Sequence, residues 1–176
     1  FLGGLFVVLL AFAATNEFVT KPLVAAPRPY ALKLEAEGLL KAAEFYALPN
    51  KRERTLFLRK TFDKHPDHPV VQSLDPKIRE HWELETGFSF PSGHSLNAFL
   101  FAVVLAFLIQ WLLPQGRRWV WIPFLWAGGV CLSRIAVGVH SPLDVTVGAL
   151  LGGLVGCLVL MAGLFDKVLP AEPMEN

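Results

Sequence analysis

Long stretches of this 176-residue sequence contain no charged side chain, which excludes an ordinary soluble domain. None occurs from Leu96 to Leu113 or from Val145 to Phe165, and most charged residues lie instead between Glu17 and Glu85. Uncharged apolar runs of this length are typical of helices that cross a lipid bilayer. With 53% hydrophobic residues and a mean hydropathy of +0.46, the sequence is predicted to form a single membrane domain.

Cysteine is also scarce, and the sequence has no acidic or basic tail. Both cysteines, Cys131 and Cys157, fall within apolar runs, where a small buried side chain is their usual role. They therefore indicate neither a disulfide framework nor a metal site. The opening run from Phe1 to Ala14 lacks the charged start and the cleavage pattern of a signal peptide. We expect this sequence to be a piece of a longer protein, with spanning helices upstream.

The apolar runs predict an all-α fold, a polytopic transmembrane helix bundle, because backbone groups in lipid must be paired within their own segment. One helix is expected to end near Phe18, and three spans are expected over residues 95–113, 119–139 and 142–165. We expect residues 1–176 to form one membrane-embedded domain. Residues 30–90 would be an external amphipathic insertion within it.

Inside that insertion, apolar residues recur at helical spacing over residues 31–48 and again over 51–62. The pattern predicts amphipathic helices on the bilayer surface, with a solvated linker as the alternative. Asp75 and Pro76 fit the N-cap and first position of a further short helix. In the last span, Gly148, Gly152 and Gly156 recur at every fourth position, which predicts close helix packing.

The orientation follows from Arg117 and Arg118, which lie in a short loop and place that loop in the cytoplasm. Alternation of the spans then brings three other loops to one external face. These loops lie around residues 21–29, 91–94 and 140. Their predicted convergence places polar residues from distant parts of the sequence at one end of the bundle.

The first two loops carry candidate anion-binding residues. Lys21 and Arg28 lie just beyond a helix end, although basic residues beside a span more often only extend to the interface. The second loop reads PSGHS from residue 91 and opens a span. Exposed N–H groups at a helix start can seat a phosphate, and Gly93 permits close approach to the backbone. A helix capped by Ser92 with His94 at its surface is the structural alternative.

The third loop follows Arg134, which is costly at the end of an apolar helix unless it is paired or lies in a wet cavity. Ser141 and Asp144 fit the N-cap and N3 positions of a capping box, which by itself explains Asp144. A carboxylate at N3 also reaches back toward His140 and can orient its imidazole. Both interpretations of Asp144 stay open from the sequence.

Together the loops supply three cations, two histidines and one carboxylate. Phosphoryl transfer depends on positioning and on stabilising the charge of the equatorial oxygens, which such a set can do. Two imidazoles also permit one to attack phosphorus while the other protonates the leaving oxygen.

At these residues the sequence resembles the type 2 phosphatidic acid phosphatase superfamily. Its three motifs occur in order: K-x6-R-P at residues 21–29, P-S-G-H at 91–94 and S-R-x5-H-x3-D at 133–144. The stretches around residues 44–46 and 81–90 further resemble the bacterial phosphatidylglycerophosphate phosphatase branch. Enzymes of that branch act on phosphatidylglycerophosphate, phosphatidic acid and undecaprenyl diphosphate at the outer face of the inner membrane. They usually have six spanning helices, whereas four are expected here.

The resemblance implies a phosphohistidine mechanism. His140 would be the nucleophile, Asp144 would hold its ring and His94 would be the general acid. The phosphate would be bound by Lys21, Arg28, Ser92, the Gly93 backbone and Arg134. The expected partners are a phospholipid or polyprenyl-phosphate substrate and the bilayer, with no nucleic acid, cofactor or metal. A non-catalytic membrane protein that binds or transports an anionic lipid is the main alternative, and a vanadate-binding haloperoxidase-like oxidant is a third.

Overall fold

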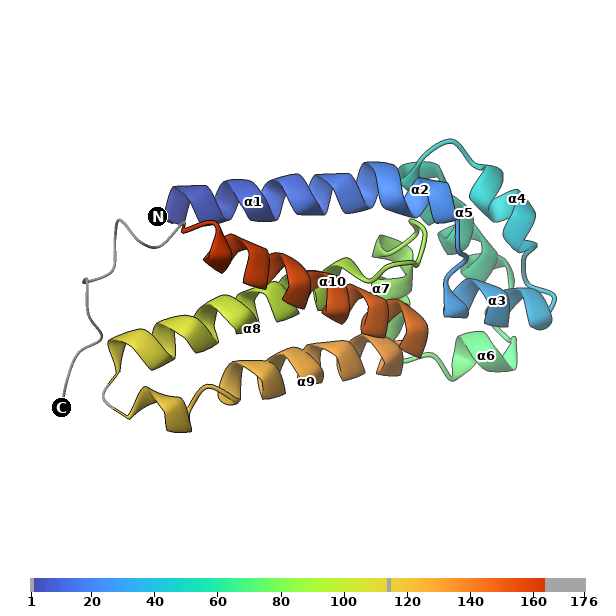
Figure 1. Ribbon diagram of the computed structural model, residues 1–176. Helices are drawn as coiled ribbons and strands as arrows, with labels where there is room; N and C mark the ends of the chain where they lie inside the picture. The colour runs from blue at the N-terminus through green and yellow to red at the C-terminus, as the bar shows by residue number, and fades with distance from the viewer. Residues whose placement is uncertain (1, 114, 164–176) are drawn as a thin grey trace.

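The computed structural model describes residues 2–113 and 115–163, and every element assigned there is helical. The long helices of the bundle lie side by side, and the remaining helices gather beyond one end of them (Figure 1). In chain order the elements are α1 (Leu2–Thr15), the π-helical turn η1 (Asn16–Thr20), α2 (Lys21–Val24), α3 (Pro29–Ala36), α4 (Ala42–Ala47), α5 (Lys51–Lys64), α6 (Pro69–Gln72), α7 (Pro76–Leu84), α8 (Gly93–Leu112), the 3-10 turn η2 (Gly116–Arg118), α9 (Ile122–Ala136) and α10 (Pro142–Met161). The predicted all-α fold is confirmed.

Three of the long helices are long and apolar enough to cross a membrane: residues 93–112, 116–136 and 142–161. Their outward side chains are apolar, as Leu125, Leu132 and Leu150 show with about two thirds of their surface exposed. Exposed leucines on a helix surface are expected where lipid replaces water as the solvent. The three predicted spans are therefore confirmed, with bounds that differ by a few residues.

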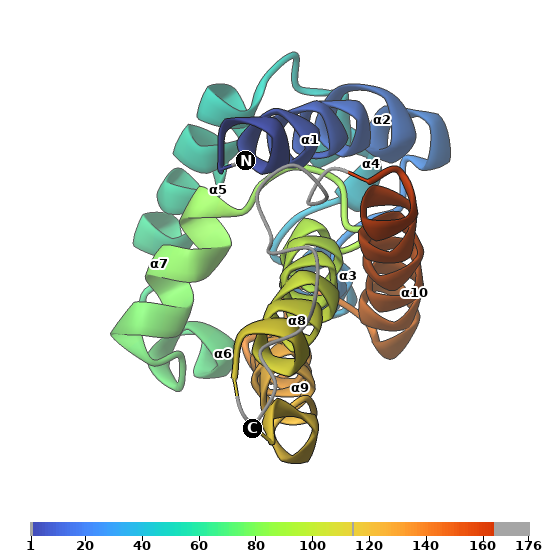
Figure 2. The same cartoon turned by 60° about the vertical axis from the view of Figure 1, so that its left-hand side comes forward.

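The centre of the bundle is α8, which packs against both α9 and α10, while α1 lies against α8 (Figure 2). The α8–α10 contact is close because glycines face it. A Cβ placed on Gly152 would lie 2.0 Å from the carbonyl oxygen of Leu96, and one on Gly148 would lie 2.5 Å from that of Ser92. The predicted packing role of these glycines is thus confirmed.

The first helix extends further than predicted. It does not end near Phe18, because η1 and α2 continue it to Val24, and Ala25 then takes a left-handed conformation with φ 49°. Asn16 is only 5% exposed. The polar residues of this segment find partners inside the protein, so they do not mark the end of the helix.

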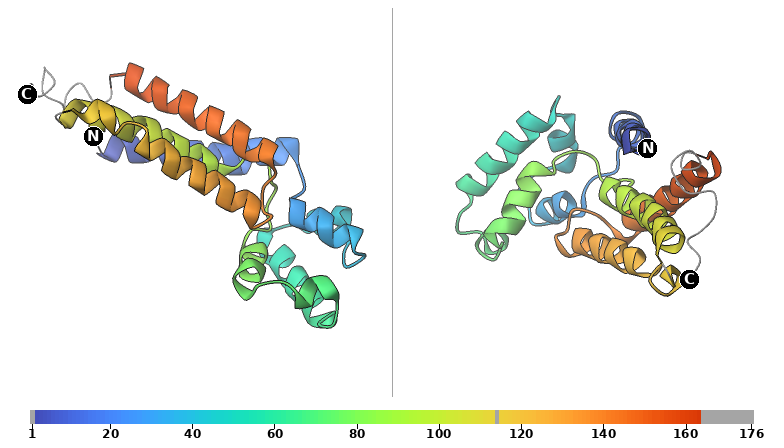
Figure 3. Two further views of the ribbon diagram at one scale, coloured as in Figure 1. Left: turned by 90° about the horizontal axis from the view of Figure 1, so that it is seen from below. Right: turned by 90° about the vertical axis from the view of Figure 1, so that its left-hand side faces the viewer.

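The short helices α3 to α7 pack together beside the end of the bundle (Figure 3). The single helix predicted over residues 31–48 is instead two, α3 and α4, because the chain turns at Gly38 with φ +72°. The helices predicted at α5 and α7 are confirmed, and the Asp75 side chain caps α7 by accepting from the N–H of Lys77 at 2.8 Å. A position of α5 on the bilayer surface stays a prediction.

A compact apolar core joins these short helices to the loop between α9 and α10. Tyr30 and Trp82 stack with their ring centroids 5.0 Å apart, and Val139 of that loop is fully buried in the same cluster. The Trp82 indole N–H also donates to the carbonyl of Val137 at 2.7 Å. The short helices therefore hold in place the loop that carries His140.

Candidate active site

The three predicted loops meet at one end of the bundle. Backbone hydrogen bonds join them. The N–H of Ser89 donates to the carbonyl oxygen of Ala26 at 2.9 Å, that of Tyr30 to the carbonyl oxygen of Gly138 at 3.0 Å, and that of Ser92 to the backbone carbonyl oxygen of Asp144 at 3.0 Å. Each bond connects two different loops. The relative positions of the side chains on these loops are thus fixed by main-chain contacts.

His140 lies at the centre of this arrangement and is 2% exposed. Its Nδ1 faces Asp144, with 3.6 Å to Oδ2, and its Nε2 lies 3.4 Å from Nη1 of Arg28. Asp144 is the N3 residue of a capping box on α10, and its Oδ2 also accepts from the Ser141 N–H at 2.6 Å. Both interpretations of Asp144 that the sequence left open therefore apply together: it caps the helix and faces the imidazole.

Ser89 adds a third contact to this carboxylate. Its hydroxyl donates to Oδ2 of Asp144 and lies 3.4 Å from Nδ1 of His140. A carboxylate held by a hydroxyl and by a backbone N–H keeps its position, and so fixes which imidazole nitrogen it faces. His140 consequently presents Nε2 toward Arg28.

Arg28 is 1% exposed, and its guanidinium is held on every side. Nε donates to the Gly87 carbonyl at 2.8 Å, Nη1 to the Val139 carbonyl at 3.0 Å and Nη2 to the Glu85 carboxylate at 2.7 Å. A buried arginine with fixed donors is well suited to a bound oxyanion because little side-chain entropy remains to be lost.

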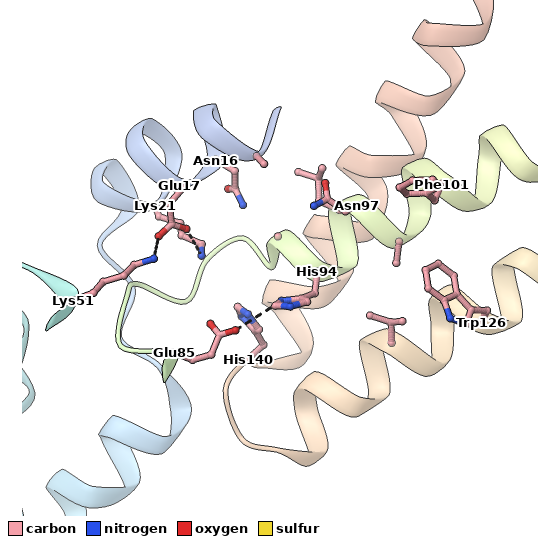
Figure 4. A pocket seen from close by; sticks show the side chains of 15 residues that line it. Asn16, Glu17, Lys21, Lys51, Glu85, His94, Asn97, Phe101, Trp126 and His140 are labelled. Carbon is pink, nitrogen blue, oxygen red and sulfur yellow. Dashed lines mark hydrogen bonds and ion pairs between the residues drawn. The ribbon is translucent and has the colours of Figure 1, made fainter. Parts of the chain in front are cut away.

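His94 lies in the first turn of α8, next to Gly93. Its side chain is 51% exposed, and its Nδ1 lies 4.0 Å from Oε1 of Glu85, whose other oxygen binds Arg28. Glu85 thus lies between the predicted general acid and the predicted phosphate-binding arginine. Figure 4 shows His94 and His140 side by side, with Glu85 next to them.

Lys21 is buried and forms an ion pair with Glu17 at 2.8 Å. The other oxygen of Glu17 contacts the ammonium group of Lys51, which comes from α5. One carboxylate therefore neutralises part of the positive charge of two lysines beside the cavity. Figure 4 shows the ion pairs of Glu17 with Lys21 and Lys51.

The N-terminus of α8 is the capped helix start at which phosphate binding was predicted. Ser92 is fully buried and caps the helix by accepting from the N–H of Ser95 at 3.3 Å. Gly93 follows as the first helical residue. The end of a 20-residue helix that begins in this way carries the positive end of the helix dipole.

Arg134, which was also predicted to bind phosphate, makes its contacts with residues close to it in sequence. Its Nε lies 3.3 Å from Oγ of the adjacent Ser133, and its carbonyl accepts from the N–H groups of Val139 and His140. The backbone of Arg134 therefore shapes the loop of the nucleophile candidate. A role for its guanidinium in binding phosphate stays a prediction.

A cavity of about 620 Å³ is lined by residues of α1, η1, α2, α5, α8 and α9 together with Glu85 and His140, while Arg28, Ser92 and Arg134 lie outside its lining. Polar and charged side chains line one part of it, and apolar side chains of α8 and α9, such as Phe101 and Trp126, line another (Figure 4). The polar lining comprises Asn16, Glu17, Lys21, Lys51, Glu85, His94, Asn97 and His140. A cavity that is polar at one end and apolar along the spans fits an amphiphilic molecule.

Burial and neighbouring charges set the protonation of the groups outside the spans. Burial lowers the pKa of His140 and Arg28 acts in the same direction, while Asp144 opposes them, so the pKa lies below its ordinary 6.5. Burial raises the pKa of Glu85, but nearby positive charges, Arg28 first, outweigh it and leave that pKa lowered. At neutral pH the imidazole of His140 is therefore uncharged and Glu85 is ionised.

Three functional candidates were not predicted from the sequence: Glu17, Glu85 and Ser89. Each lies outside the three motifs and resembles many other surface acids or serines in a polar stretch. Within residues 2–113 and 115–163, no group of three or more His, Cys, Asp or Glu side chains is placed to hold a metal ion. Metal independence of any reaction here stays a prediction.

The fold and this site define a helical membrane protein with a buried histidine and a buried arginine at one end of its spans. A family model described as "PAP2 superfamily" matches residues 1–165. The chain belongs to the PAP2 superfamily, as its three motifs predicted.

Curated relatives agree with the family. Phosphatidylglycerophosphatase B of Escherichia coli (strain K12) is 35% identical over 152 residues, which cover 84% of this chain and 56% of that protein. Phosphatidylglycerophosphatase B of Haemophilus influenzae is 29% identical over 167 residues, covering 89% and 64%. An undecaprenyl-diphosphatase of Sulfolobus acidocaldarius is 42% identical over 74 residues, covering 42% and 32%. The chain thus spans little more than half the length of the first of these relatives.

Proposed function

We propose that the protein is a membrane lipid phosphatase that works through a phosphohistidine. The observation that carries the proposal is the orientation of buried His140, with Nδ1 toward Asp144 and Nε2 toward Arg28. A neutral imidazole held in this way has its free electron pair on Nε2, next to the cations that would hold a phosphate. This is the arrangement that nucleophilic attack on phosphorus requires.

In the proposed first step, Nε2 of His140 forms a bond to phosphorus as the bond to the lipid oxygen breaks. His94 donates a proton to that oxygen, and Asp144 stabilises the positive charge that develops on the imidazole. Arg28, Lys21, the Gly93 N–H and Arg134 stabilise the equatorial oxygens. In the second step His94 takes a proton from water, the water oxygen bonds to phosphorus, and inorganic phosphate leaves His140.

The relatives' names support two substrate classes, a phosphatidylglycerophosphate and an undecaprenyl diphosphate, and the motif resemblance adds phosphatidic acid as a third. All three join a phosphate to an apolar chain, as the divided lining of the cavity requires. We further propose a multi-pass location in a bacterial inner membrane with the site on the external face. The arginines of η2 lie at the opposite end of the bundle from His140, which supports this orientation (Figure 1).

The test is phosphate release in detergent from the three lipids in parallel, in chelator, by the complete protein and two variants. His140→Ala is expected to abolish release. His65→Ala changes an exposed histidine outside the cavity and serves as the matched control, with activity unchanged. Release by the parent that is lost in chelator would contradict metal independence. No release from any lipid would contradict the enzyme proposal and favour the second candidate, a protein that binds or transports an anionic lipid.

The second candidate has one observation in its favour. A protein named bacitracin transport permease BcrC, from Bacillus licheniformis, is 40% identical over 115 residues, covering 59% of this chain and 53% of that protein. Lipid binding without catalysis requires the predicted phosphate-binding cations Lys21, Arg28 and Arg134 but not the pairing of His140 with Asp144. Equal binding of phosphatidic acid vesicles by the parent and by His140→Ala, without release by either, would support this candidate.

A further inference from the structure

The cavity contains two asparagines that the phosphatase mechanism does not use. Asn16 lies at the junction of α1 and η1, and Asn97 lies on α8, one turn after Gly93. Both line the cavity, and in Figure 4 both side chains lie in the space between the first helix and α8. The Oδ1 atoms of both are buried and have no hydrogen-bond partner among residues 2–113 and 115–163.

The orientation of the Asn16 amide is set by its surroundings. Its Nδ2 lies 3.5 Å from the carbonyl oxygen of Pro91, a long contact that only a donor can make. The same nitrogen would lie 3.3 Å from a Cβ on Gly93, so the amide covers the start of α8. Turning the amide over would bring two carbonyl oxygens together, and therefore Oδ1 is the end that lacks a partner.

An unpaired amide oxygen at this position is costly. Asn16 is 5% exposed in a segment that continues an apolar helix, where a buried polar atom without a partner loses its hydration and gains nothing. The amide is also not required to cap a helix, because η1 continues α1 through Asn16 with its own backbone bonds. A π-helical turn is itself a feature found often at functional sites. These observations indicate that Oδ1 has its partner in a bound molecule.

The chemistry of that partner follows from the atom. A carbonyl oxygen accepts a hydrogen bond and repels a phosphate oxygen, so Oδ1 of Asn16 does not bind the phosphate itself. Of the cations of the site, Lys21 lines the same cavity as Asn16 and is paired with Glu17, while Arg28 is paired with Glu85. The ligand group must therefore be an uncharged donor close to the phosphate, and a hydroxyl on the leaving group meets this condition.

We propose that Asn16 recognises a hydroxyl group on the lipid alcohol next to the scissile phosphate ester, and so determines which phosphorylated lipid is preferred. The proposal rests on the proposed phosphatase function. A phosphatidylglycerophosphate carries such a hydroxyl on the glycerol between its two phosphates. Phosphatidic acid and a polyprenyl diphosphate have none. Asn97 extends the polar lining on the same part of the cavity.

The test uses two synthetic substrates that differ in this hydroxyl alone: phosphatidylglycerophosphate and the analogue in which 1,3-propanediol replaces the glycerol between the phosphates. The kcat/KM for phosphate release is measured for both with the parent, Asn16→Leu, Asn16→Ala and the control Phe101→Leu. Phe101 lines the same cavity without a polar group. The ratio of the two kcat/KM values within one variant does not depend on how much of that variant is folded.

The parent is expected to prefer the hydroxyl substrate by about threefold to tenfold, the range for one neutral hydrogen bond. Both Asn16 variants are expected to lower that ratio to about one, while Phe101→Leu keeps it. An unchanged ratio in the Asn16 variants, or equal loss on both substrates, would overturn the proposal and give Asn16 a purely structural role. Release from neither substrate by the parent would instead be a failure of the phosphatase function itself.

Discussion

Replacement of Gly152 by alanine tests whether the contact between α8 and α10 positions the catalytic groups. The added Cβ would lie 2.0 Å from the Leu96 carbonyl oxygen, whereas ordinary contact begins at 3.4 Å, so the two backbones must separate by about 1.4 Å. The position of the added Cβ is fixed by the backbone of α10 and its partner is a backbone oxygen, so no side-chain rotation relieves the overlap. Leu96 lies one turn from Ser92, which binds the Asp144 carbonyl directly. The separation therefore moves the phosphate seat away from His140.

The adjacent Gly153 gives a matched control, because a Cβ there meets no atom within 4 Å. Alanine at either position gains about 1 kcal/mol of helix propensity over glycine. Overpacking at Gly152 costs about 1–3 kcal/mol in addition. Gly152→Ala is thus expected to be less stable than Gly153→Ala by about 1–3 kcal/mol. A displacement of about 1 Å at the site is expected to lower kcat by about 100-fold.

Two measurements on the two purified variants in detergent check this: the unfolding midpoint, and phosphate release from the substrate that the parent hydrolyses fastest. The midpoint does not depend on the proposed activity, so the packing argument can be judged even if no substrate is found. Gly152→Ala with the same midpoint and the same turnover as Gly153→Ala would refute both the close approach and its link to the site.

Three other predictions concern single groups of the site. Because burial lowers the pKa of His140 below 6.5, the acid limb of the profile of kcat/KM against pH is expected below pH 6.5, and a limb above that value would contradict a neutral buried nucleophile. Glu85→Gln removes the charge paired with Arg28 at 2.7 Å and is expected to lower kcat/KM about tenfold, while Glu44→Gln, which breaks the exposed pair with Lys41, leaves it unchanged. Tyr46→Phe removes the hydroxyl that accepts from the backbone N–H of Arg28 at 2.9 Å. The free energy of unfolding is expected to fall by about 1–3 kcal/mol, and an unchanged denaturation midpoint would show that this hydrogen bond contributes nothing.

The sequence was sufficient to predict the three spanning helices and to locate the three motifs. Apolar runs without charge specify spanning helices because lipid leaves the backbone no other way to pair its polar groups. The regular glycines of the last span indicated a close helix contact, since only a residue without a Cβ allows such an approach, and the structure identifies α8 as the partner. The order of the motifs predicted the family, which the match over residues 1–165 confirms.

The contacts among the motif residues, and between them and other residues of the site, are determined by the tertiary structure. Glu85 and Ser89 became candidates only because folding places them against Arg28 and Asp144, which are more than fifty residues away in sequence. The first helix was expected to end near Phe18, yet its continuation through η1 buries Asn16 beside the cavity. Local patterns specify helices because their hydrogen bonds are local. Burial and partnership of a polar group depend on which distant backbone lies beside it, and that is set by packing between helices.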